Sequence, residues 1–122
     1  MPEEMVIFTR TYDLLTWLLP QTETFPRSQR FVVTRRLQDA ALDFQERLIE
    51  ANATRSPSER ARGLGQADAA LRKLRLYLRL AHRWQWLDTR RYEHVSTMVA
   101  EIGRLLGGWL RATQKGGAPQ SS

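Results

Sequence analysis

The sequence predicts an all-α protein, an antiparallel up-down-up-down four-helix bundle. Apolar residues recur at spacings of three and four along four long segments, and short breaker sequences separate these segments. None of them alternates between apolar and polar residues as a strand would. A chain of 122 residues, 42% of them hydrophobic, is long enough to bury one core. We therefore expect one domain over residues 1–112.

The first helix is expected from about Glu4 to Leu19. Pro20 and the segment "QTETFP" end it, and Phe25 falls in the connection because a residue before a proline is biased away from helix. Its apolar residues occupy two adjoining sides, Ile7, Leu14 and Leu18 on one and Phe8, Tyr12, Leu15 and Leu19 on the other.

The second helix is expected to begin at Arg27 and to end near Ala53. Its apolar stripe is Phe31, Leu37, Ala41, Phe44 and Leu48. A stripe of this kind predicts one side that faces the core and one that faces solvent.

The third helix has the clearest start signal. In "SPSE", Ser56 is the expected N-cap, Pro57 takes the first helical position, and Glu59 completes a capping box. Gly63 and Gly65 weaken the first turns. The helix should run to about residue 84, and its core side is Leu71, Leu74, Leu78 and Ala81, widened by Tyr77, Leu80 and Trp84.

The fourth helix is expected after a cap at Asp88 or Thr89. Its apolar positions are Tyr92, Val95, Val99, Ile102, Leu106 and Trp109. The remaining segment "TQKGGAPQSS" has no apolar residue able to dock, so residues 113–122 are expected to form a disordered tail.

The net charge of +6 is concentrated in one region. Residues 71–91 hold seven cations and one acid, whereas the rest of the chain holds 12 of each. On a helical wheel Arg72, Arg75, Arg79 and Arg83 share a narrow stripe, roughly 16 Å long at about 1.5 Å of rise per residue. The candidate nucleic-acid-binding residues are Arg72, Lys73, Arg75, Arg79, Arg83, Arg90 and Arg91.

Two other interpretations of this stripe remain open. It could dock an acidic protein, or it could be a plain solvent face. A solvent face usually mixes charges of both signs, which this stripe does not. The neighbouring rings could stack bases. We expect Trp84 to continue the core side, whereas Trp86 could pack against the helix connection or form an exposed platform.

Catalysis has little support in the sequence. The chain has no cysteine, no Gly-rich phosphate loop and no paired-carboxylate motif, and His82 and His94 have no acid at metal-ligand spacing. We expect no enzyme activity, no metal and no cofactor. Gly103, Gly107 and Gly108 predict a close approach between helices. Without a signal peptide or a long apolar run, a cytoplasmic protein is expected.

Three segments resemble a known family. "YDLLTWLLPQTETFPRSQRF", "RLYLRLAHRWQWLDTRRYEHVS" and "EIGRLLGGWLRA" are similar to the accessory variability determinant (Avd) proteins of diversity-generating retroelements. These belong to a wider four-helix-bundle family that includes proteins encoded in ribosomal-RNA intervening sequences. The likeness spans about residues 8–112.

The resemblance implies a homopentameric barrel that binds the reverse transcriptase of its element together with template-region RNA and cDNA. Such a protein is needed for mutagenic reverse transcription and retrohoming, and has no polymerase active site of its own. The arginines would then hold RNA or cDNA phosphates. The broad apolar surface of the first and fourth helices, more than one bundle needs, would be the subunit interface. The alternative is an RNA-binding scaffold of the intervening-sequence type without a polymerase partner, and a third class is a protein-interaction bundle.

Overall fold

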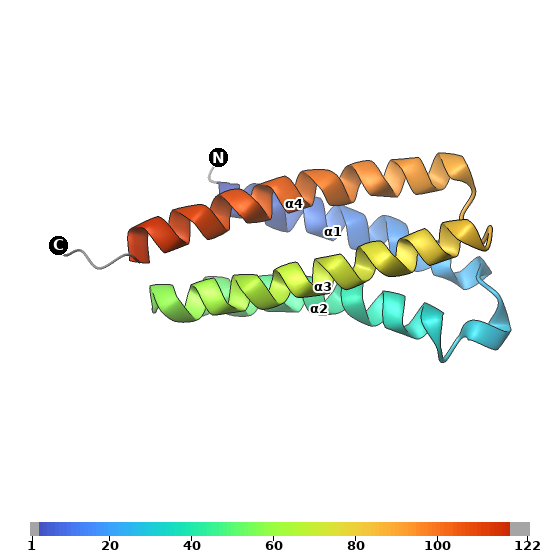
Figure 1. The fold of residues 1–122 in the computed structure, drawn as a ribbon, viewed down its shortest axis with the longest axis horizontal. Coiled ribbons are helices and arrows are strands. Elements are labelled where there is room, and N and C mark those ends of the chain that lie inside the picture. The colour runs from blue at the N-terminus through green and yellow to red at the C-terminus, as the bar shows by residue number, and fades with distance from the viewer. Residues whose placement is uncertain (1–2, 118–122) are drawn as a thin grey trace.

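The structure is a computed structural model that describes residues 3–117. It consists of four long helices. They are α1 (Glu3–Gln21), α2 (Val33–Ala53), α3 (Pro57–Arg83) and α4 (Thr89–Gly117), with two short 3₁₀ helices, η1 (Thr22–Thr24) and η2 (Arg27–Gln29), between α1 and α2. Successive helices run antiparallel, and the α1–α2 connection lies at the same end as the α3–α4 turn (Figure 1). The described residues contain no strand. The predicted up-down-up-down bundle is therefore confirmed.

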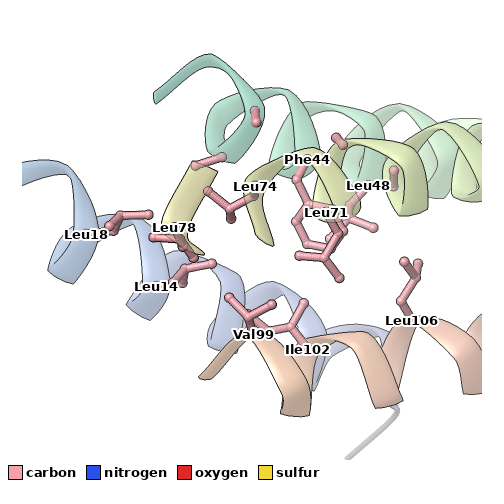
Figure 2. Packing of buried hydrophobic residues seen from close by; sticks show 14 of the residues in the cluster. Leu14, Leu18, Phe44, Leu48, Leu71, Leu74, Leu78, Val99, Ile102 and Leu106 are labelled. Atoms are coloured by element: carbon pink, nitrogen blue, oxygen red, sulfur yellow. The ribbon is translucent and has the colours of Figure 1, made fainter. Parts of the chain in front are cut away.

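The core lies along the axis between the four helices. Figure 2 shows its side chains pointing inward from all of them: Leu14, Leu18, Phe44, Leu48, Leu71, Leu74, Leu78, Val99, Ile102 and Leu106. Each is at most 2% exposed. Burying one side chain of this size contributes about 1.5–3 kcal/mol, so these stripes account for the arrangement of the helices. None of the described helices is both long and apolar enough to cross a membrane.

The connection between α1 and α2 differs from the prediction. Helix α2 begins at Val33 rather than Arg27, because Val32 has non-helical backbone angles (φ −117°, ψ −98°). Phe31 therefore leaves the apolar stripe and is 73% exposed. Phe25 is buried instead, with its ring centroid 5.3 Å from that of Trp86. The contact joins the two connections at this end of the bundle.

The start of α3 confirms the predicted N-cap. The Oγ of Ser56 accepts a hydrogen bond of 3.2 Å from the Glu59 amide. The reciprocal half of the capping box is different, because the Glu59 carboxylate accepts from the Thr54 hydroxyl at 3.2 Å. Arg60 also donates to the carbonyl oxygens of Ala51 (3.1 Å) and Thr54 (2.5 Å). One side chain thus satisfies carbonyls at the end of α2.

The α3–α4 turn is a Schellman motif. The Trp86 amide donates to the Ala81 carbonyl at 2.8 Å, and the Gln85 amide donates to the His82 carbonyl at 2.9 Å. Gln85 has a positive φ of 64°, a position that usually holds glycine. Asp88 then caps α4, because its Oδ1 accepts from the Arg91 amide at 2.8 Å.

Helix α4 is longer than predicted. It continues through Gly117, and Thr113 is only 8% exposed. The prediction of a tail from residue 113 is therefore wrong for its first five residues. Thr113 lies one turn after the buried Trp109, so the packed face of the helix continues. Residues 118–122, the rest of the predicted tail, lie outside the described residues.

Candidate nucleic-acid interface

A groove runs between α3 and α4 on the basic side of the bundle. One part of it is lined by Arg75, Leu78, Arg79, Tyr92, Ser96, Val99 and Ala100. Small side chains on α4, Ser96 and Ala100, face the arginines of α3 across it. Towards the α3–α4 turn it adjoins a wider pocket that shares Arg79 and Tyr92. The helix pair thus forms one continuous concave surface.

Three arginines of the predicted stripe carry unneutralised charge at this groove. Arg75, Arg79 and Arg83 are exposed, and none has a carboxylate within ion-pair distance among the side chains of residues 6–115. Arg72 differs, because its Nε lies 2.9 Å from Oδ2 of Asp68. One arginine of the stripe is therefore paired with an acid on the same helix, which the spacing of the four arginines did not indicate. The positive charge that remains available to an anion is that of Arg75, Arg79 and Arg83.

Arg75 lies across α4 rather than pointing straight into solvent. Its Nη2 is 2.5 Å from the place where a Cβ on Gly103 would stand. Gly103 therefore leaves room for the guanidinium, as well as for the Leu71 side chain behind it. The predicted close approach at this glycine exists, but the group that approaches most closely is the arginine side chain.

The wider pocket is lined by residues from the end of α3 to the start of α4 and has a volume of about 780 Å³. Its lining is Leu76, Arg79, Leu80, His82, Arg83, Gln85, Leu87, Asp88, Thr89 and Tyr92. The rings of His82 and Tyr92 are stacked, 4.3 Å apart and parallel within 1°. Nε2 of His82 also lies 3.2 Å from the Thr89 hydroxyl. These contacts fix one aromatic pair beside two free guanidinium groups.

The other predicted cations lie elsewhere. Arg90 and Arg91 line a separate pocket with Trp17, Asp88 and His94, between α1 and the start of α4. The Trp17 and His94 rings are 4.9 Å apart there. Lys73 is exposed on α3 and lines none of these pockets. The seven predicted residues thus belong to at least two surfaces, and only Arg75, Arg79 and Arg83 share the groove.

The structure overturns the expectation for Trp84 and favours one of the two alternatives for Trp86. Trp84, expected on the core side, is the C-cap of α3 and is 48% exposed. The chain turns at Gln85, so the α3 face that would have buried Trp84 ends there. Trp86 is half-buried against Phe25. Their ring centroids are 5.1 Å apart.

Several groove residues were not among the predicted site residues. His82, Gln85 and Tyr92 come together only because the turn folds α4 back along α3. Among the side chains of residues 6–115, no three potential metal ligands gather in a cluster that could hold an ion.

Known proteins resemble this chain both in sequence and in fold. A sequence model of the family described as bAvd-like matches residues 5–113. A crystal structure of a protein with unknown function from the S23 ribosomal protein family of Bacteroides thetaiotaomicron VPI-5482 superposes with a TM-score of 0.83. It is 16% identical and covers 90% of this chain and 99% of its own, a likeness that shows the fold alone. No curated protein matches the sequence.

Proposed function

The chain belongs to the bAvd-like family, and on that premise we propose that it is a non-catalytic accessory subunit of a diversity-generating retroelement. In this role it binds the reverse transcriptase of the element together with template RNA and cDNA. The nucleic acid lies in the α3–α4 groove. The complex carries out mutagenic reverse transcription and retrohoming, with the polymerase chemistry supplied by the partner.

The observation that carries this proposal is the set of unpaired arginines in the groove. Arg75, Arg79 and Arg83 present planar guanidinium groups that suit phosphate oxygens. Each phosphate that they neutralise releases counterions, so affinity should fall steeply as salt rises. A groove of this kind holds a strand in place without performing chemistry on it.

Assembly into a homopentamer is part of the same proposal. The exposed apolar surface differs from the one expected on the first and fourth helices, because the large exposed apolar residues of α1 and α2 are Tyr12 (63%), Leu42 (39%) and Ile49 (53%), and the described part of α4 exposes none. Leu42 and Ile49 are seven residues apart and share a face of α2. Burying them between copies would remove apolar surface from water. Five chains of charge +6 would carry 5 × 6 = +30, which strengthens attraction for nucleic acid.

A second candidate is an RNA-binding scaffold of the ribosomal intervening-sequence type without a polymerase partner. The fold shared with the S23-family protein favours it. Light scattering after size-exclusion chromatography, with and without the reverse transcriptase of the same retroelement, separates the two. A mass near five times 14.2 kDa that shifts when the polymerase is added supports the retroelement role. A mass indifferent to the polymerase favours the scaffold.

The groove itself is tested by charge reversal. Replacing Arg75, Arg79 and Arg83 by glutamate should abolish RNA binding in a fluorescence-anisotropy titration while helicity stays unchanged. The matched control makes the same charge change at Arg36, Arg55 and Arg62, which are exposed and outside the groove. Equal losses in both triple variants would indicate net charge rather than a site. Unchanged affinity in the groove variant would refute the assignment.

A further inference from the structure

The pocket at the α3–α4 turn combines groups that phosphate binding alone does not require. Arg79 and Arg83 supply positive charge, Leu76 is 49% exposed, and the stacked rings of His82 and Tyr92 form part of the lining. Its volume of about 780 Å³ lies in the range of about 300–1,000 Å³ that is typical of sites for small ligands. A nucleotide has the same combination, a charged phosphate attached to a flat base.

Gln85 is a second, independent feature of this pocket. Its φ of 64° belongs to the left-handed region, where glycine is favoured because a Cβ is strained. The chain nevertheless places a glutamine here, and Gln85 is one of the residues that line the pocket. A carboxamide offers both donors and an acceptor, which is the set of groups that reads the edge of a base. The position thus combines backbone strain with a group suited to recognition.

We propose that this pocket takes one unpaired base of a bound RNA or cDNA strand. The phosphate beside that base lies on Arg79 and Arg83, the base rests against the His82–Tyr92 pair, and its edge faces the Gln85 carboxamide. The proposal rests on the proposed nucleic-acid function and makes it more specific, because it names single-stranded nucleic acid as the ligand.

Geometry favours a single strand over a duplex. In a duplex the bases are stacked and paired inside, so none can enter a side pocket without being flipped out of the stack. The phosphates of a duplex can still approach Arg75 in the open groove. Base-to-ring contact adds sequence-tolerant affinity for unpaired strands, which suits a protein that handles template and product of varying sequence.

The test compares two strands that differ only in their bases. Anisotropy titrations of the full chain use a short single-stranded oligonucleotide and an abasic strand with the same number of phosphates. The base-containing strand should bind about tenfold more tightly. Gln85→Gly and Tyr92→Leu should remove most of that difference and leave affinity for the abasic strand unchanged. Gln66→Ala, at an exposed glutamine of α3 outside the pocket, is the matched control.

Each outcome separates this inference from the function on which it rests. Equal wild-type affinity for both strands would overturn the base pocket while nucleic-acid binding stands, as would variants that weaken both strands alike. Absence of binding to either strand would overturn the proposed function as well. Gln85→Gly relieves backbone strain, so the variant should fold, and circular dichroism confirms that its helicity is intact.

Discussion

The guanidinium of Arg75 occupies the space that a side chain on Gly103 would need, with Nη2 2.5 Å from the position of that missing Cβ. One residue of α3 and one of α4 therefore determine together where this guanidinium lies. The glycine has no side chain, so the Arg75 side chain can lie across the surface of the neighbouring helix. Four predictions follow from relationships of this kind.

Gly103→Ala should weaken RNA binding without unfolding the protein. A Cβ at this position displaces the far end of Arg75, a flexible group, while alanine favours the helix by about 0.8–1.0 kcal/mol. We expect a severalfold loss of affinity. The slope of the logarithm of the binding constant against the logarithm of salt concentration should fall in magnitude by about one. Gly65→Ala is the control, because nothing lies within 4 Å of its Cβ position. It should raise stability and leave RNA affinity unchanged; a loss equal to that of Gly103→Ala would contradict the groove geometry.

Phe25→Ala and Phe31→Ala should differ sharply in thermal and urea unfolding. Phe25 is 5% exposed and contacts Trp86, so its truncation should cost about 3–5 kcal/mol. Phe31 is 73% exposed, and its truncation should change the free energy of unfolding by less than about 0.5 kcal/mol. The reverse order would mean that α2 begins at Arg27, as the sequence pattern suggested.

Asp88→Ala should destabilise the start of α4. The carboxylate accepts from the Arg91 amide at 2.8 Å, and loss of an N-cap typically costs about 1 kcal/mol. Asp88→Asn keeps an acceptor and should retain most of the stability, which a urea titration measures. If both variants lose the same amount, charge near the helix start matters more than the cap hydrogen bond.

Ile49→Glu should reduce the mass of the assembly measured by light scattering. Ile49 is 53% exposed on the α2 face that we assign to the subunit interface, and a charge there would be buried without a partner. Gln66→Glu adds the same charge at an exposed position of α3 and should leave the mass unchanged. A protein that is already monomeric before substitution would refute the pentamer directly.

Local sequence signals predicted the helices well where one side of each helix carries the core. The stripes of α1, α3 and α4 and the caps at Ser56 and Asp88 depend on residues within one or two turns of each other. The start of α2 could not be read in the same way. It depends on the backbone of Val32 and on Phe25, which is buried by Trp86 from the other connection.

The sequence by itself determined the fold class and the helix from which the basic surface projects, because periodicity and the concentration of charge are local properties of the chain. Only the tertiary structure decided which cations lie together. Asp68 neutralises Arg72, and Arg90 and Arg91 belong to a pocket beside α1. Gly103, His82, Gln85 and Tyr92 join the remaining arginines because the turn at Gln85 folds α4 along α3. Contacts between residues far apart in the chain depend on how helices pack, which no single segment encodes.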